Sequence, residues 1–358
     1  MMRTIKLRPI RYSITGCIAA AALLVGCGGS RAGSGAGAMP QSLAGRARGS
    51  NSSGDLVYAT TTGTGGQIFT YPSGSLVGAF SVPQGTPFWL CSDSKGDVFV
   101  LAAHRSGSGS ALIYEFAHGS TSPFATLNVP APYGAEGCAS DEKTGNLAVT
   151  VADVHGNAEL LVYQNALGSP AVYTGPYINV QAQPGYDNMG NLFVTSESYD
   201  KLTELPAGTT VLESVSINAQ FPDARGVQWD GKYLAIEAPA NRHGNPKDIP
   251  ILVTRVSVSG SQAKIVSVVR LEKSNDSSSG HGWITNGMLL GPSAHQIWLY
   301  KYPKGKRLSA FAKAGRSSYI FGVTLSVGSR SKRGAKQMKS LGLRHYGRAA
   351  RAGARASV

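Results

Sequence analysis

Side chains that could carry out chemistry are scattered along this sequence and form no recognisable set. The seven histidines stand singly at positions 104, 118, 155, 243, 281, 295 and 345, without the His-x-x-x-His spacing of a zinc site. No Gly-x-Ser-x-Gly elbow is present, and the Asp-bearing turns lack the alternating acids and final Glu of an EF-hand. The sequence therefore predicts no catalytic residue, no metal site and no cofactor.

A repeated unit of strand, turn and strand determines where these side chains would lie. It reads FWLCSDSKGDVFVL from residue 88, AEGCASDEKTGNLAV from 135, QPGYDNMGNLFV from 183 and GVQWDGKYLAI from 226. The turns carry Asp93 and Gly96, Asp141 and Gly145, Asp187 and Gly190, and Asp230 and Gly231. Glycine supplies the positive φ of a hairpin turn, and the Asp side chain bonds the turn's own amides.

The repeats predict a closed all-β fold. Each hairpin is followed by a third and a fourth apolar run, which makes a four-stranded meander every 40 to 60 residues. The second strands are almost continuously apolar, so both faces of each sheet should be covered. Innermost strands start near Trp89, Glu136, Pro184, Gly226, Trp283 and Phe321. Residues 319–326 form the last of these and should pair with the first strand, 55–59, closing a six-bladed β-propeller without exposed edges.

This pattern resembles the NHL-repeat and gluconolactonase-like group of six-bladed propellers, and in particular uncharacterised bacterial propeller lipoproteins. The resemblance covers residues 55–326 and concerns the fold. The lactonases of this group hold a divalent metal with a Glu, an Asn and an Asp, and their first blade carries a Glu-Gly-Pro-aromatic segment. Here Glu136-Gly137 is followed by Cys138 in a different blade, and no matching Asn and Asp can be assigned.

A ligand-binding channel mouth is predicted where the innermost strands begin. Propeller ligands meet loops at one face around the channel, and such sites combine aromatic with a few polar side chains. The candidates are Phe88, Trp89, Tyr133, Glu136, Gln183, Arg225, His281 and Trp283. Blade packing is the alternative reading for each of them.

Cys91 and Cys138 precede the turns of two successive innermost strands. They could form a disulfide outside the cytoplasm, or be two small buried apolar residues. We favour the second reading, because adjacent inner strands need not bring the α-carbons within about 7 Å.

The N-terminus has the features of a lipoprotein signal peptide, which we assign to residues 1–26. Four basic residues precede an apolar stretch, 12–25, that is too short to span a bilayer. Leu24-Val25-Gly26-Cys27 resembles the bacterial lipobox, which predicts lipidation of Cys27 and a membrane anchor; the alternative is a secretory signal cut after Ala38. Residues 27–54 are rich in Gly and Ser and read as a flexible linker.

The net charge of +14 does not indicate nucleic-acid binding. Residues 1–49 and 330–358 hold sixteen of the 34 Lys and Arg and no acids, so the middle of the chain carries about −2. A groove that follows a phosphate backbone needs positive charge on the folded domain. We read 328–358 as a disordered basic tail that could attract anionic lipid or another anionic envelope polymer.

Together these features predict a lipid-anchored protein of the cell envelope, outside the cytoplasm, with its propeller at residues 55–327. Gly28 and Gly29 lack the Asp that retains many lipoproteins at the inner membrane, which favours the outer membrane or the cell surface. We expect a non-catalytic binding or scaffolding module for a small molecule, a glycan or a protein. The alternative is a metal-dependent lactonase-like hydrolase.

Overall fold

The computed structural model describes residues 54–103, 110–130, 134–153, 155–195, 200–221, 223–240, 249–274, 281–314 and 319–328. Over these ranges the chain is all-β, and the short 3-10 turn η1 (Gln164–Ala166) is the one helical element. It has no helix long and apolar enough to cross a membrane in the part described. The signal peptide, Cys27, the linker up to residue 53 and the basic residues 330–358 lie outside the described residues, so the functions assigned to them stay predictions.

Four of the five hydrogen-bonded sheets have four strands each. The first, in the order β24-β1-β2-β3, contains β24 (Ile320–Ser326), β1 (Leu56–Thr61), β2 (Gly65–Thr70) and β3 (Leu76–Ser81). The second contains β4 (Thr86–Ser92), β5 (Val98–Ala103), β6 (Leu112–Phe116) and β7 (Ala125–Asn128). The third contains β8 (Gly134–Ser140), β9 (Leu147–Ala152), β10 (Ala158–Tyr163) and β11 (Ala171–Tyr173). The fourth contains β20 (Trp283–Thr285), β21 (Met288–Ser293), β22 (Gln296–Lys301) and β23 (Lys306–Lys313).

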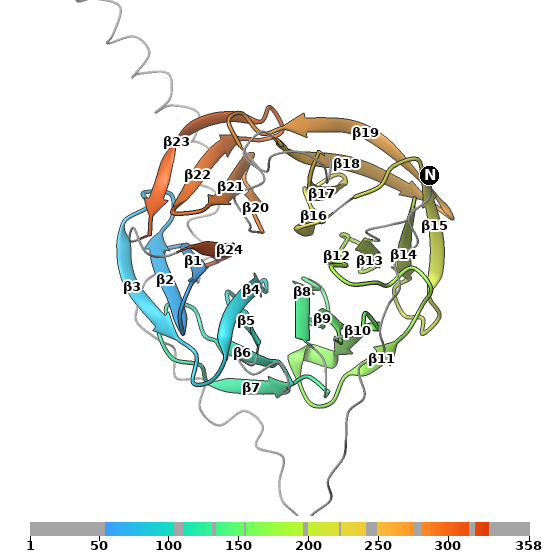
Figure 1. Ribbon diagram of the computed structural model, residues 1–358, viewed down its shortest axis with the longest axis horizontal. Helices are drawn as coiled ribbons and strands as arrows, with labels where there is room; N and C mark the ends of the chain where they lie inside the picture. The colour runs from blue at the N-terminus through green and yellow to red at the C-terminus, as the bar shows by residue number, and fades with distance from the viewer. Residues whose placement is uncertain are drawn as a thin grey trace, which may run out of the picture. The chain divides into compact units, whose positions relative to one another are not determined.

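The fifth sheet has eight strands and consists of two meanders. One is β12 (Pro184–Tyr186), β13 (Leu192–Thr195), β14 (Lys201–Leu205) and β15 (Glu213–Ile217). The other is β16 (Gly226–Trp229), β17 (Leu234–Pro239), β18 (Ile251–Ser259) and β19 (Gln262–Arg270). The described residues thus form five hydrogen-bonded sheets, where the six predicted blades would each give one. The β18–β19 hairpin has nine residues in each strand and reaches β15, with which it forms two parallel pairs, and the two meanders merge there (Figure 1).

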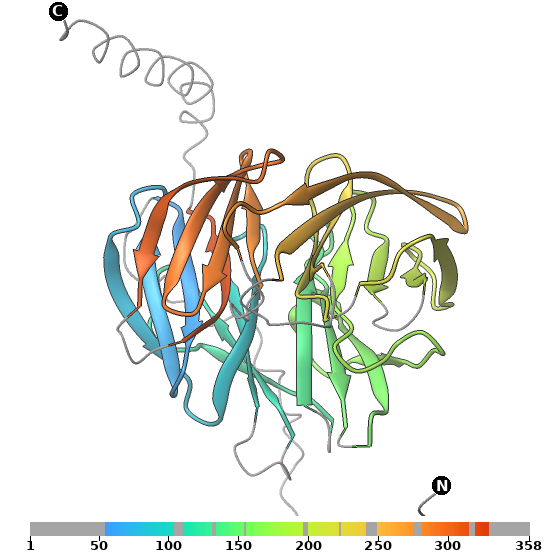
Figure 2. The ribbon, with the colours of Figure 1, turned by 45° about the horizontal axis from the view of Figure 1, so that its top comes forward.

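The strand groups are set around a central axis (Figures 1 and 2), and β4, β8, β12, β16, β20 and β24 lie nearest to it (Figure 1). The second strands β1, β9, β13 and β17 are buried along their whole length, as their continuous apolar character predicted. Six clusters of buried apolar side chains are found among the described residues, and each joins two neighbouring four-stranded groups. Because each group buries both faces, the hydrophobic core is distributed between the groups.

The two ends of the described domain pair as the sequence predicted. Strand β24 runs antiparallel to β1, with Leu56 opposite Ser326 and Thr60 opposite Gly322. Outside the ladder, the amide of Thr62 donates to the carbonyl of Tyr319 at 2.9 Å. The first and last strands thus complete one sheet.

The predicted turn chemistry is also present. The carboxylate of Asp93 accepts the amides of Lys95 and Asp97, both at 2.9 Å. The corresponding Asp141, Asp187 and Asp230 accept turn amides in the same way. Gly96, Gly145, Gly190 and Gly231 have φ values of 89°, 73°, 93° and 94°, which strain a residue with a Cβ. These turns hold each inner strand against its second strand.

Candidate ligand-binding site

A cavity of about 530 Å³ lies where the innermost strands end and turn into the second strands. Every one of β4, β8, β12, β16, β20 and β24 contributes to its wall, directly or through the turn that follows. The aromatic side chains in the wall are Tyr186, Trp229, Trp283 and Tyr302. The acidic ones are Asp93, Asp141, Glu142, Asp187 and Asp230, and the cationic ones are Lys143 and Arg255. The cavity therefore combines aromatic surfaces with several carboxylates, four of which are held by their own turns.

The structure divides the predicted channel-mouth residues into two groups. His281 and Trp283 line the cavity, whereas Tyr133 lies outside the described residues. Phe88, Trp89, Glu136, Gln183 and Arg225 are described and are not part of the cavity wall. They belong to the beginnings of the inner strands, at the opposite end from the turns. A ligand role for this second group stays a prediction.

At the beginning of the inner strands, Gln183 links two neighbouring groups. Its side-chain Nε2 donates to the carbonyl of Glu136 at 2.7 Å, and its amide donates to the hydroxyl of Thr195 at 2.9 Å. A Cβ on Gly137 would lie 2.3 Å from Oε1 of Gln183, so a larger residue there would displace the Gln183 side-chain amide. Burial raises the pKa of Glu136 above its ordinary value.

His281 connects the cavity wall to the last inner strand. Its amide donates to the carbonyl of Phe321 at 3.1 Å, and its carbonyl accepts the amide of Val323 at 3.0 Å. On the side chain, Nδ1 lies 2.9 Å from the carbonyl of Arg225, so Nδ1 carries the proton and Nε2 is an acceptor. Burial lowers the pKa of His281 to about 4, which keeps the ring neutral near pH 7. The ring of Trp283 is perpendicular to it, with 6.3 Å between the centroids.

Glu237 on β17 is a buried carboxyl behind this wall. Its Oε2 accepts the amide of Gly282 at 3.0 Å, and its backbone carbonyl accepts the amide of Arg225 at 2.7 Å. Burial raises its pKa from 4.5 to about 7, although the positive charge of Arg225 and the amide of Gly282 act in the other direction. Sequence analysis did not single out Glu237, which interrupts an otherwise apolar second strand.

The raised pKa of Glu237 predicts a pH dependence of stability. The folded protein binds this proton more tightly than the unfolded chain does. The resulting stabilisation is fully present below pH 4.5 and is lost as the pH rises to about 7. Relative to wild type, Glu237→Gln should gain about 3 kcal/mol in free energy of unfolding across this range. Urea unfolding at several pH values measures it, with Glu213→Gln at an exposed position as control. A pH-independent difference between Glu237→Gln and wild type would contradict the assignment.

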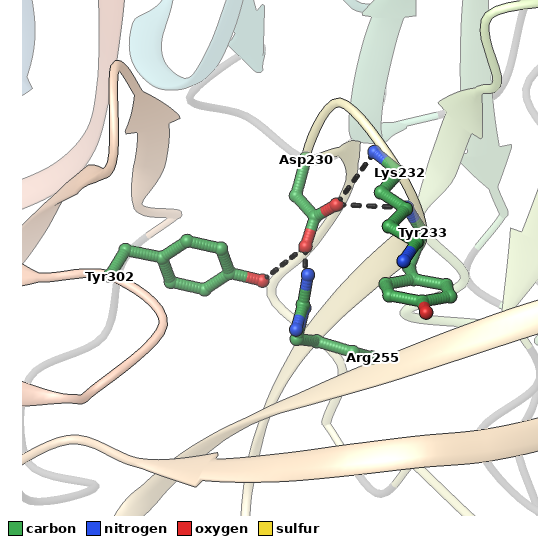
Figure 3. Close-up of polar contacts among 5 residues, drawn as sticks. All are labelled: Asp230, Lys232, Tyr233, Arg255 and Tyr302. Atoms are coloured by element: carbon green, nitrogen blue, oxygen red, sulfur yellow. Dashed lines mark hydrogen bonds and ion pairs between the residues drawn. The ribbon is translucent and has the colours of Figure 1, made fainter.

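Asp230 is the most completely bonded carboxylate of the cavity wall (Figure 3). Its Oδ1 accepts the amides of Lys232 at 3.0 Å and Tyr233 at 2.8 Å. Its Oδ2 accepts Nε of Arg255 at 2.6 Å and the hydroxyl of Tyr302 at 2.8 Å. Burial alone would raise the pKa of Asp230, but these donors hold it below its ordinary value. The guanidinium of Arg255 stacks 4.7 Å from the ring centroid of Tyr233. Since Tyr302 follows β22, this cluster ties two strand groups together beside the cavity.

Cys91 and Cys138 form a disulfide in the cavity wall. The α-carbons are 5.8 Å apart, within the range that a disulfide spans, so our preference for two unlinked cysteines is wrong. The cause is the close approach of β4 and β8, which places the same position of two successive repeats side by side. The bond fixes neighbouring inner strands across 47 residues of sequence.

Among the described residues, no group of three His, Cys, Asp or Glu side chains is placed to hold a metal ion. Two of the histidines outside the cavity have other contacts: Nδ1 of His118 lies 2.6 Å from the hydroxyl of Ser326, and the ring of His295 is tilted by 52° to that of Tyr319, with 4.8 Å between the centroids. His104, His243 and His345 lie outside the described residues.

No protein-family model matches this chain, and no curated protein matches it. Among solved structures, a protein of unknown function from Bacteroides caccae aligns with a TM-score of 0.51 and 12% identity, over 76% of this chain and 99% of that one. Apo AztD from Citrobacter koseri aligns with a TM-score of 0.43 and 11% identity, over 77% of this chain and 98% of that one. At 12% identity, the similarity to the Bacteroides caccae protein concerns the all-β fold alone. We draw no conclusion from the similarity to AztD, whose TM-score is below 0.5.

Proposed function

We propose that this protein is a non-catalytic binding module, a six-bladed β-propeller that takes a small polar ligand into the cavity at the turn end of its inner strands. Six meanders contribute one innermost strand each, and the six apolar clusters between them support the blade count. Closure of the first blade by β24 and β1 supports the ring. In this interpretation, the two residue pairs that join β15 to β19 are a contact between two neighbouring blades.

The cavity itself carries the proposal. Its volume of about 530 Å³ lies within the range of small-molecule sites, which combine apolar walls with a few fixed polar groups. Trp229 and Trp283 offer ring surfaces, while Asp93 and Asp187 offer carboxylates whose direction is set by their own turns. A site whose polar groups are already held in place loses little entropy on binding.

Ligand binding at this place is testable with tryptophan variants. Full-length protein in detergent, titrated with a panel of monosaccharides, amino acids and amines, should show saturable changes in tryptophan fluorescence. For any binder, Trp283→Ala should weaken affinity about tenfold or more, since buried aromatic contacts dominate binding energy. Trp298→Ala on β22 is the matched control, because Trp298 is half-buried outside the cavity wall. Equal losses in both variants, or chelator-sensitive hydrolysis of a lactone, would contradict the proposal.

We propose further that the protein is a lipoprotein anchored outside the cytoplasm through Cys27. The lipobox-like segment supports the anchor, and the Cys91–Cys138 disulfide supports an oxidising compartment. Several acyl chains hold a protein on a membrane where a single chain does not. Cys27→Ser should move the protein from the membrane pellet to the soluble fraction and abolish incorporation of labelled fatty acid. Fatty-acid labelling that persists in Cys27→Ser would show that the anchor is elsewhere.

A further inference from the structure

The cavity wall is acidic, although the whole chain is basic. Five carboxylates and two cationic side chains face the cavity, a formal charge of −3 when histidine is neutral. One of the two cations, Arg255, is paired with Asp230 at 2.6 Å and adds no free positive charge. An anionic ligand would lose its hydration and meet repulsion in such a site, whereas a cation would be attracted.

Two of the carboxylates are fixed by their turns and keep capacity for a further donor. Oδ1 of Asp93 accepts both turn amides, and its Oδ2 accepts no hydrogen bond from the described residues. Asp187 accepts two amides at Oδ1 and the side-chain amide of Asn191 at Oδ2. An ionised carboxylate has about four acceptor positions, so both can receive a ligand N–H.

His281 adds an independent indication of the ligand. It is 9% exposed and lines the cavity, and its Nδ1 is used by the carbonyl of Arg225. Its Nε2 has no hydrogen-bond partner in the described part of the chain. This ring nitrogen is an acceptor that the protein leaves open at the cavity wall, so it can take an N–H from a ligand.

The aromatic wall completes the set of groups. The ring of Trp283 lies beside His281, and Tyr186 and Trp229 face the same cavity. Aromatic faces attract cations within about 6 Å of the ring centroid, and most strongly when the site is desolvated. A neutral sugar would also stack on these rings, but it gains nothing from the charge of the wall.

We propose that the ligand of this cavity is a small organic cation with N–H donors, a protonated primary or secondary amine. Its ammonium group lies at the Asp93 and Asp187 carboxylates, and its carbon chain extends along the aromatic wall toward Trp283 and His281. This inference rests on the proposed function, ligand binding in the same cavity, and names the chemical class of the ligand.

Charge-removing substitutions that preserve the turns test the inference. Asp93→Asn and Asp187→Asn keep the Oδ1 acceptor that each turn needs and remove one negative charge each. Asp153→Asn is the matched control, because Asp153 bonds the amides of His155 and Asn157 in the same kind of turn and lies outside the cavity wall. Circular dichroism melting of all variants establishes that they are folded.

Calorimetric titration of the full chain compares putrescine with its neutral N,N′-diacetyl derivative, glucose and calcium chloride. We expect putrescine to bind wild type and Asp153→Asn equally, to bind the Asp93→Asn/Asp187→Asn double variant about tenfold or more weakly, and the diacetyl derivative not to bind. Each lost factor of ten is about 1.4 kcal/mol.

Other outcomes overturn the inference and separate it from the proposed function. If glucose or the diacetyl derivative binds as tightly as putrescine, and Trp283→Ala weakens that binding, the cavity is a binding site for a neutral ligand. If calcium binds and the double variant abolishes it, the ligand is an inorganic cation. If putrescine binds the double variant as it binds wild type, the amine lies elsewhere. If nothing in this panel binds, the inference fails, and if the fluorescence titration also finds no ligand, the proposed function fails as well.

Discussion

A chain that ends at residue 318 is expected to lose its cooperative fold, whereas a chain that ends at residue 328 should be as stable as the full length. The first truncation removes β24, the partner of β1. Ile320, Val323 and Leu325 on β24 are 1%, 0% and 4% exposed and belong to one apolar cluster. Full burial of such a side chain contributes about 1.5–3 kcal/mol. The loss, about 5–9 kcal/mol, is comparable with the whole stability of a typical domain, about 5–15 kcal/mol.

Hydrogen bonds between β24 and β4 of the neighbouring sheet increase this cost. The hydroxyl of Ser92 on β4 lies 2.8 Å from the hydroxyl of Thr324 and donates to the carbonyl of Leu325 at 2.8 Å. Both hydroxyls are buried, so removing one partner leaves the other without compensation. Circular dichroism and urea unfolding of the two truncated chains measure the effect. A sharp unfolding transition at an unchanged midpoint in the chain ending at 318 would contradict closure by β24.

Loss of the Cys91–Cys138 disulfide should lower the free energy of unfolding by about 4 kcal/mol. The bond closes a loop across 47 residues of sequence, and the chain-entropy relation gives about that value for such a loop. Cys91 and Cys138 lie in the cavity wall on β4 and β8, which belong to different hydrogen-bonded sheets. Urea unfolding of wild type with and without dithiothreitol measures the effect.

The Cys91→Ala/Cys138→Ala double variant is the control for the disulfide. Its stability should be low and should not respond to dithiothreitol, because no cross-link remains to be reduced. If dithiothreitol left the unfolding of wild type unchanged, the predicted contribution of the disulfide to the free energy of unfolding would be contradicted.

Turn residues and apolar runs, which act over a few neighbouring residues, allowed much of the fold to be predicted from the sequence. Asp187 and Gly190 lie where a hairpin turn needs a side-chain acceptor and a positive φ. The Asp187 carboxylate accepts a turn amide, and Gly190 has a φ of 93°. The continuous burial of Leu147–Ala152 follows from an unbroken apolar run. Contacts between strand groups are less visible. The parallel contact of β15 with β19 involves two residue pairs, and no sequence period encodes it.

The candidate site was harder to predict for a related reason. The repeats indicate that the position of Trp89 recurs at one end of the inner strands and the position of Asp93 at the other. They do not show at which of the two ends the side chains leave open space. The cavity lies at the Asp turns, which sequence analysis interpreted as turn residues alone. A stronger signal was available: acids at the same position in four successive repeats must converge on one end of the channel. The Cys91 and Cys138 pair could have been read in the same way.

The central claim, that this protein binds its ligand in the cavity at the turn end of the inner strands, is tested most directly by a crystal structure of the full chain with the tightest binder. We expect density for the ligand against Trp283 and His281, within reach of the Asp93 and Asp187 carboxylates. Density at the opposite end, beside Trp89 and Glu136, with the turn-end cavity holding only solvent, would contradict it.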